Sequence, residues 1–234
     1  MKKHIPNAIT CCNLMSGCIA TYFAFDGVYR MALLFIVIGA VFDFFDGMSA
    51  RLLHVSSPIG KELDSLADDV TFGVAPSSIV FTFLAGMTPD WPLLPYVAFL
   101  IAAFSALRLA KFNLDERQAT SFIGLPTPAN ALFWASLVLW LQGQYADAGV
   151  TQPDWWFFVV LVLIPVSCYL LIAELPLFAL KFKHWGWQGN EVKYLFLLSS
   201  VLILLGAFAM GFGALGIAAV IAWYVALAAF TRNR

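Results

Sequence analysis

The chain has 234 residues, of which 62% are hydrophobic and 12% are charged, and its formal net charge is −1. A soluble domain usually carries about 25% charged residues, so this composition excludes an ordinary soluble protein. We expect the protein to be surrounded by membrane lipids and to have no nucleic-acid partner.

Eight apolar segments follow one another along the chain, and most of them are close to the roughly 20 residues that a helix needs to cross a bilayer. Turn residues separate them, such as Asp26-Gly27 and Gly211-Phe212-Gly213. We therefore predict an all-α fold, a polytopic transmembrane helix bundle of about eight helices (six to eight), with residues 1–234 forming a single domain. A single broken helix at the end of the chain would give seven. The predicted helices are 8–25, 29–53, 61–86, 92–113, 126–143, 154–173, 193–210 and 213–231.

The basic residues predict the orientation of this bundle. With eight helices, all but one of the 13 Lys and Arg residues fall on the same side, and Arg30 is the exception. Loops that stay in the cytoplasm carry the excess of basic residues. We therefore predict an integral protein of the cell (inner, cytoplasmic) membrane with both termini facing the cytoplasm. The residues on the predicted cytoplasmic side are Lys2, Lys3, Arg51, Lys61, Arg108, Lys111, Arg117, Lys181, Lys183, Lys193, Arg232 and Arg234.

Four aspartates lie inside two strongly apolar segments, within residues 43–68. An unpaired acid in a membrane helix costs roughly 2.5–3.5 kcal/mol on insertion scales, and four neighbouring acids would also repel one another. Oxygen ligands at this density are typical of sites for hard divalent cations such as Mg²⁺ or Mn²⁺. The four residues are Asp43, Asp46, Asp64 and Asp68.

Helical spacing predicts that these carboxylates meet. Asp43 and Asp46 are three residues apart, and Asp64 and Asp68 are four apart, so each pair shares one helix face. The predicted helix 29–53 runs toward Arg51, and the predicted helix 61–86 runs back in the opposite direction. This arrangement places the two pairs of aspartates at similar depths. We predict a catalytic hairpin over residues 43–68 whose site opens to the cytoplasm. Such a site could hold two metal ions that clamp a phosphate or pyrophosphate.

A divalent-cation or proton-coupled membrane transporter is the non-enzyme alternative. It predicts polar residues at the middle of several other helices. The later apolar segments contain few polar residues, such as Ser105, Asn130 and Ser167, and no acid at that depth. Chemistry on a lipid headgroup is therefore the favoured interpretation.

The same residues carry a resemblance to a known family. The pattern D-x2-D-G-x2-A-R-x8-G-x3-D-x3-D is the signature of the CDP-alcohol phosphotransferases, and the chain resembles them at all eight fixed positions. The matching residues are Asp43, Asp46, Gly47, Ala50, Arg51, Gly60, Asp64 and Asp68. Enzymes with this signature join a CDP-linked lipid or alcohol to a hydroxyl acceptor and release CMP.

Further segments look like one branch of that family, the bacterial CDP-diacylglycerol–serine O-phosphatidyltransferases. These are IPNAITCCNLMSG near the start, LADDVTFGVAPS, which runs on from the motif residue Asp68, ALRLAKFN at 106–113 and FIGLPTPANA at 122–131. The resemblance implies CDP-diacylglycerol and L-serine as substrates, phosphatidylserine as product, and a homodimer. The same chemistry on glycerol 3-phosphate or inositol phosphate stays open as an alternative.

The resemblance also implies roles for the motif residues. The four aspartates would hold two divalent cations on the pyrophosphate, and Asp68 would in addition act as general base on the acceptor hydroxyl. Arg51 would bind phosphate oxygens, so that Asp68 and Arg51 form the catalytic pair. The CDP-lipid would contact Asp46, Gly47, Ala50, Arg51 and Gly60. Direct displacement is favoured over a phosphatidyl-enzyme intermediate, because every acid already has a role.

The acceptor pocket is predicted from basic residues on the fourth helix. Serine needs a cation for its carboxylate, and Arg108 and Lys111 lie near the cytoplasmic end of that helix, with Asn113 beside them. Arg108 lies deeper in the span, where a charge needs a partner. Anchoring at the membrane surface is the alternative role for both basic residues.

Overall fold

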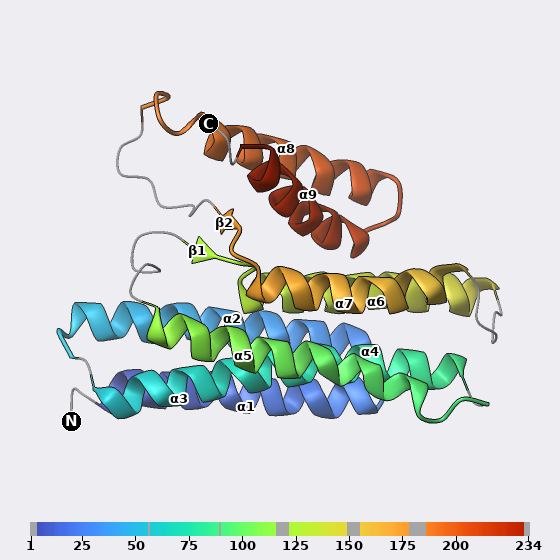
Figure 1. Ribbon diagram of the computed structural model, residues 1–234, viewed down its shortest axis with the longest axis horizontal. Helices are drawn as coiled ribbons and strands as arrows, with labels where there is room; N and C mark the ends of the chain where they lie inside the picture. Colours follow the sequence, from blue (N-terminus) through green and yellow to red (C-terminus); the bar gives the residue numbers. More distant parts are fainter. Residues whose placement is uncertain are drawn as a thin grey trace.

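Figure 1 shows a computed structural model of the protein, which describes residues 4–55, 57–88, 90–115, 122–148, 155–177 and 186–231. Its elements in chain order are α1 (Ile5–Phe25), α2 (Tyr29–Leu52), α3 (Pro58–Asp68), the π-helical turn η2 (Asp69–Val74), α4 (Ala75–Met87), the 3₁₀ turn η3 (Leu94–Phe99), α5 (Leu100–Leu114), β1 (Phe122–Ile123), α6 (Thr127–Ala148), α7 (Trp155–Ile172), β2 (Pro176–Leu177), α8 (Glu191–Ala209) and α9 (Leu215–Thr231).

The predicted all-α bundle of eight helices is confirmed over the described residues. Two rods are composite, because α3, η2 and α4 run on without a break, as do η3 and α5. The last two segments are separate helices, since Gly211 breaks the chain between them with a φ of +78°. Strand structure in the described ranges is limited to the antiparallel pairing of β1 with β2, two residues each.

Six of the rods are long and apolar enough to cross a membrane, and α9 is a shorter apolar helix. Their outward faces are apolar, with large side chains such as Leu198, Leu202 and Phe208 exposed along α8. Exposed apolar surface on this scale requires a nonpolar solvent around the bundle. The protein is therefore an integral membrane protein.

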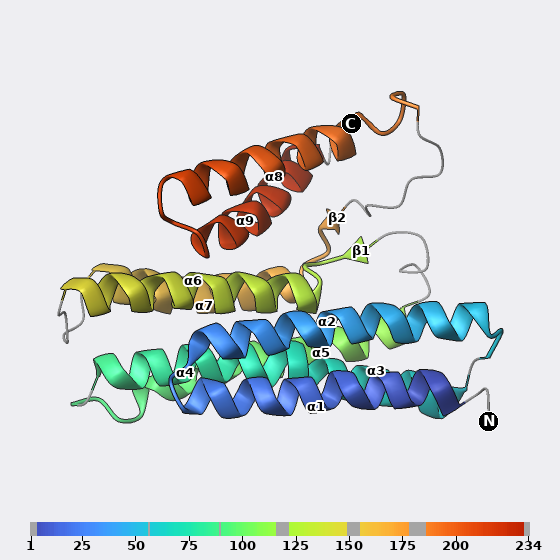
Figure 2. The same cartoon turned by 180° about the vertical axis from the view of Figure 1, so that it is seen from behind.

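The helices are arranged in three layers (Figure 1 and, from behind, Figure 2). Helices α1 to α5 form the first layer, α6 and α7 cover it, and the α8–α9 hairpin lies outermost. Within the hairpin, α9 packs on α6 and β2, while α8 contacts mainly α9. The core lies between the first two layers, where Phe72, Ile79 and Trp134 are completely buried. The indole nitrogen of Trp134 donates to Ser167 Oγ at 3.1 Å, so this large buried ring is also satisfied.

Local sequence explains how the α2–α3 hairpin is built. Helix α3 begins with Pro58 in its first turn, and the Ser57 hydroxyl accepts a hydrogen bond from the backbone N–H of Gly60 at 3.1 Å. This is a side-chain N-cap, which satisfies a donor that the helix itself leaves free. Helix α3 begins three residues before the predicted start at residue 61, because the proline and its serine cap belong to its first turn.

The predicted regular helix over residues 61–86 is interrupted by the π turn η2, which begins directly after Asp68. A π turn adds one residue to a helical turn and rotates everything that follows it, and such turns are frequent at functional sites. Here it places Thr71 and Phe72 against the neighbouring helices, where both are completely buried.

The ends of α2 and α5 and the starts of α1, α3 and α8 lie at the same end of the bundle (Figure 1). Arg51, Lys61, Lys111 and Lys193 are therefore on one side, whereas Arg30 is near the opposite end. Arg108 lies within α5, one helical turn before Lys111. The remaining basic residues on which the predicted orientation depends lie outside the described residues: Lys2, Lys3, Arg117, Lys181, Lys183, Arg232 and Arg234.

Candidate active site

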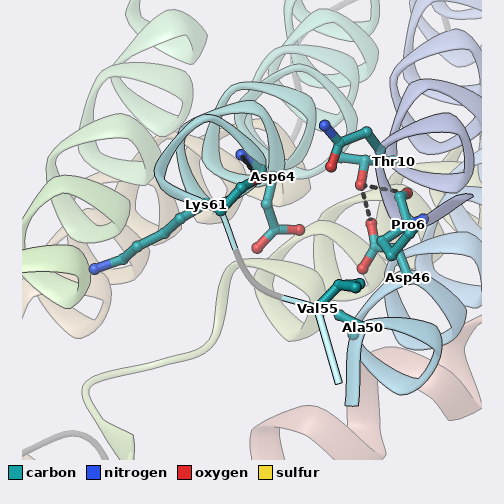
Figure 3. A pocket seen from close by; sticks show the side chains of 11 residues that line it. Pro6, Thr10, Asp46, Ala50, Val55, Lys61 and Asp64 are labelled. Atoms are coloured by element: carbon teal, nitrogen blue, oxygen red, sulfur yellow. Dashed lines mark hydrogen bonds between the residues drawn. The ribbon is translucent and has the colours of Figure 1, made fainter. Parts of the chain in front are cut away.

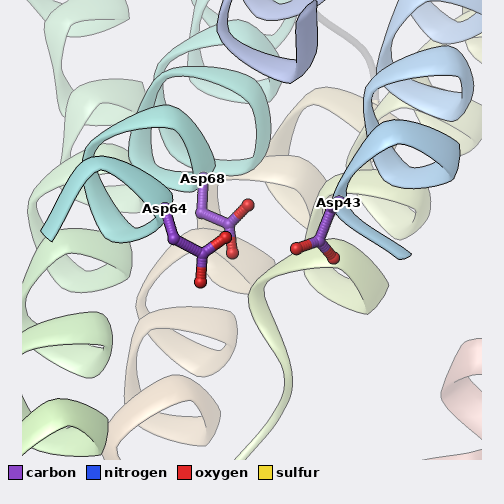
Figure 4. A group of neighbouring side chains, drawn as sticks. All are labelled: Asp43, Asp64 and Asp68. Carbon is purple, nitrogen blue, oxygen red and sulfur yellow. The ribbon is translucent and has the colours of Figure 1, made fainter. Parts of the chain in front are cut away.

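Three of the four predicted aspartates come together between α2 and α3. Asp43 projects from α2, Asp64 and Asp68 project from α3, and all three point into one shared space (Figure 4). One carboxylate oxygen of each lies within 4.8 Å of the others. The convergence follows from helical spacing, because Asp64 and Asp68 are one turn apart and present the same face to α2.

Asp46 lies beside this group and is held by α1. The Thr10 hydroxyl donates to Asp46 Oδ2 at 2.6 Å, as Figure 3 shows, and the Asp46 side chain is only 5% exposed. A short hydrogen bond to a carboxylate is roughly twice as strong as one between neutral groups. Asp46 therefore has a fixed orientation, one helical turn nearer the end of the bundle than Asp43.

A pocket of about 260 Å³ opens next to the aspartates, between α1, α2 and α3 (Figure 3). Two of the acids, Asp46 and Asp64, face each other across it. Gly47, Ala50 and Gly60, which were predicted to contact the CDP-lipid, also line the pocket. Their small side chains leave the space free. The lining is Pro6, Asn7, Thr10, Asp46, Gly47, Ala50, Val55, Ser57, Gly60, Lys61 and Asp64.

The two basic residues near this pocket, Arg51 and Lys61, differ in where their charged groups lie. Arg51 is exposed at the end of α2, with a guanidinium nitrogen 3.9 Å from where a Cβ on Gly47 would lie, so its charge is close to the pocket mouth. Lys61 points away from the pocket toward α5 (Figure 3), where its Nζ donates to the main-chain carbonyl of Asn113 at 2.9 Å. Arg51 is therefore the basic group that is free to turn toward a ligand.

The predicted acceptor residues on α5 have separate surroundings. Arg108 is 6% exposed, its guanidinium lies 5.4 Å from the ring centre of Phe112, and it is close enough to Asp68 for the two charges to interact. Lys111 is exposed. The Asn113 side chain donates to Ser65 Oγ at 2.7 Å, which ties α5 to α3. Arg108 is thus the only one of the three with a described electrostatic link to the aspartates.

Sequence reasoning missed the polar face of α1. Thr10 donates to Asp46, and Asn13 Nδ2 donates to Asp68 Oδ1 at 3.0 Å. The signal was present, since Asn7, Thr10 and Asn13 recur every three residues in a mostly apolar helix. Their partners were not visible, because spacing within one helix does not say which neighbour that face meets.

The four acids outnumber the protein cations near them in the described part of the chain, where Arg108 interacts electrostatically with one of them, Asp68. No ion pair joins any of the four aspartates to a basic side chain among the described residues, and Asp64 Oδ1 is buried without a hydrogen-bond donor. Clustered carboxylates with free oxygens are the donor set that hard divalent cations prefer. The arrangement of Asp43, Asp64 and Asp68 therefore fits a metal site.

Comparison with known proteins decides the family. A family model described as CDP-alcohol phosphatidyltransferase matches residues 3–168, which include every residue of the aspartate motif. The chain belongs to the CDP-alcohol phosphatidyltransferase family. The matched region ends within α7, so α8 and α9 lie outside it.

Several relatives carry one name, CDP-diacylglycerol–serine O-phosphatidyltransferase. The Bacillus subtilis protein is 41% identical over 126 residues, which are 54% of this chain and 70% of that protein. The Mycobacterium tuberculosis H37Rv protein is 33% identical over 180 residues, 74% of this chain and 60% of that protein. The Saccharomyces cerevisiae protein is 43% identical over 103 residues, 40% of this chain and 36% of that protein. The match thus spans less than two thirds of some of these relatives.

Proposed function

We propose that the protein transfers the phosphatidyl group of CDP-diacylglycerol to the hydroxyl of L-serine, forming phosphatidylserine and releasing CMP. The convergence of Asp43, Asp64 and Asp68 beside a pocket in a membrane-embedded bundle of this family carries the proposal. The names of the relatives support serine as the acceptor.

Two divalent cations, Mg²⁺ or Mn²⁺, complete this proposal. Asp43, Asp46, Asp64 and Asp68 would hold them through carboxylate oxygens, the hard ligands that these ions prefer. When bound, the ions would neutralise charge on the pyrophosphate and on the departing CMP. The hydrogen bond from Thr10 orients Asp46 for this role, and Asp64 keeps a buried oxygen free for it.

Asp68 is the proposed general base. The serine hydroxyl oxygen attacks the phosphorus of the phosphatidyl group, and Asp68 takes the hydroxyl proton. The bond from that phosphorus to the oxygen bridging to CMP breaks, and CMP leaves with the bonding electrons. A serine hydroxyl is a weak nucleophile at neutral pH, so a positioned base raises its reactivity. Direct displacement requires no further nucleophile from the protein.

The pocket beside the aspartates is the proposed site for the CDP part of the donor. Gly47, Ala50 and Gly60 line it, and their small size leaves room for a nucleotide. A Cβ on Gly60 would lie 3.0 Å from Ser57 Oγ, so a larger residue there would also disturb the helix cap. Arg51 at the pocket mouth is proposed to bind phosphate oxygens, for which the guanidinium fork is well suited.

Arg108 is the proposed anchor for the acceptor carboxylate, helped by Lys111 and Asn113. The guanidinium is buried, its Nε has no hydrogen-bond partner, and its charge interacts with that of Asp68. A buried cation with a free donor is suited to an anionic ligand group. An acceptor held there would have its hydroxyl near the proposed base.

We also propose a setting for the protein. The protein acts as a single domain in the cell membrane, with both termini and the active site facing the cytoplasm and with a second copy as its partner in a homodimer. The described basic residues at the site end, including Arg51 and Lys61, support this orientation.

A CMP-release assay tests the proposed function. The purified protein is given CDP-diacylglycerol with serine, glycerol 3-phosphate, inositol or inositol phosphate in turn. We expect CMP and a phospholipid product with serine alone. Release with glycerol 3-phosphate instead would replace the acceptor and keep the chemistry, whereas no release with any acceptor would contradict the enzyme assignment.

A further inference from the structure

The buried amide of Asn13 lies at the point where α1 meets Asp68. Asn13 is completely buried, and its Nδ2 donates to Asp68 Oδ1 at 3.0 Å across a sequence separation of 55 residues. The reverse amide orientation would bring the carbonyl oxygen of Asn13 against a carboxylate oxygen, so this orientation is the favourable one.

The other end of the same amide has no partner. Asn13 Oδ1 is buried without a hydrogen-bond donor, and it lies 3.0 Å from where a Cβ on Gly39 would be. A buried carbonyl oxygen without a donor is unfavourable for folding. An apolar side chain of the same size would avoid this cost, so packing alone does not explain an asparagine at this position.

The surroundings of Asn13 hold its backbone firmly. Thr71, in the π turn that follows Asp68, donates its hydroxyl hydrogen to the Asn13 main-chain carbonyl at 3.0 Å. The helices approach closely here, since a Cβ on Gly17 would come within 2.8 Å of the Thr71 Cα. The amide is therefore fixed relative to the helix that carries Asp68.

We infer that Asn13 is a positioning residue for Asp68: its amide fixes the carboxylate through one oxygen, so that the other oxygen is presented to the acceptor hydroxyl. This inference rests on the proposed function and concerns how the base is oriented. Small displacements of a reacting group cost large factors in rate, and loss of an orienting hydrogen bond to a metal ligand typically costs about 10–100-fold in metal affinity or activity.

The test compares two variants at position 13 with a matched control. Asn13→Leu keeps the size of the side chain and removes the donor, and Asn13→Ala removes the donor without any steric demand. The control is Ser16→Ala on the same helix. Ser16 is 4% exposed, and its hydroxyl donates only to the Cys12 carbonyl of its own helix.

We expect the two Asn13 variants to lose about 10–100-fold in kcat, with the KM for serine and for CDP-diacylglycerol within a factor of about two of native. Their unfolding midpoints in detergent should match that of Ser16→Ala, which should keep native kcat. Native kcat in either Asn13 variant would overturn the inference, as would failure of both to fold, since Asn13 would then act through packing. Inactivity of the native protein toward every acceptor would instead contradict the proposed function.

Discussion

Thr10 and Asp46 connect the first two helices at the edge of the aspartate group, with the Thr10 hydroxyl 2.6 Å from Asp46 Oδ2. The two residues are 36 positions apart, and both are almost completely buried. Helix α1 therefore contributes to the site through residues outside the acid motif. Its contribution differs along its length, since Thr10 contacts a proposed metal ligand and Asn13 contacts the proposed base.

Thr10→Val removes the hydroxyl while keeping the shape of the side chain. A hydrogen bond to a charged group contributes about 1.5–3 kcal/mol, so Asp46 should hold its orientation less well. We expect the Mg²⁺ or Mn²⁺ concentration for half-maximal activity to rise by about 10–100-fold. The control is Thr21→Val, because the Thr21 hydroxyl donates only to Gly17 O within α1. An unchanged metal requirement in Thr10→Val would show that Thr10 does not contribute to metal binding.

Metal removal tests the donor set itself. Asp43, Asp64 and Asp68 present oxygens within 4.8 Å of one another, with no nitrogen or sulfur ligand in the group. Such a set prefers hard cations. Chelation should abolish CMP release, and Mg²⁺ or Mn²⁺ should restore it while Zn²⁺ should restore it poorly. Full activity in excess chelator would contradict the proposed metal site.

Asp68→Asn and Asp43→Asn separate the base from a ligand. If Asp68 accepts the proton, its variant should lose about 10²–10⁴-fold in turnover, which is the usual contribution of acid–base catalysis. The affinity for CDP-diacylglycerol should fall less in Asp68→Asn than in Asp43→Asn. Titration in the presence of metal measures it. Equal loss of donor binding in both variants would leave Asp68 as a ligand only.

The helices and the meeting of the acids were predictable, because both follow from spacing within single segments. Apolar length predicts the helices, and separations of three and four residues place Asp43, Asp46, Asp64 and Asp68 on facing surfaces. The π turn was not predictable from these rules. It changes the backbone register by one residue without any change in composition.

The hydrogen-bond partners of the polar side chains also could not be predicted from the sequence. The Asn113 side chain was predicted to help hold the acceptor. In the fold this side chain donates to Ser65, while the main-chain carbonyl of Asn113 accepts from Lys61. These contacts join residues about 50 positions apart. Helical periodicity identifies a polar face, but only the packing of several helices decides what that face meets.

Close packing at α1 gives a prediction about stability. A Cβ on Gly17 would lie 2.8 Å from the Thr71 Cα and 2.9 Å from its backbone nitrogen, so neither helix could adjust cheaply. Gly17→Ala should therefore lower the free energy of unfolding by about 1–3 kcal/mol. Gly206→Ala is the matched control, because nothing lies within 4 Å of its added Cβ in α8. That control should be neutral or stabilising by up to about 1 kcal/mol. Unfolding in detergent measures both, and equal stability of the two variants would contradict the close approach.

Arg108→Lys tests the acceptor site. The guanidinium can hold a carboxylate through two parallel hydrogen bonds, and an ammonium cannot reproduce that geometry. The KM for serine should rise at least about tenfold, while the affinity for CDP-diacylglycerol changes little, because the lost interaction is one of ground-state binding. The matched control is Arg30→Lys, the same substitution at an exposed arginine near the opposite end of the bundle. Steady-state kinetics with serine as the varied substrate measures the effect. A native serine KM in Arg108→Lys, together with reduced thermal stability, would make Arg108 a structural residue and move the search for the acceptor site away from α5.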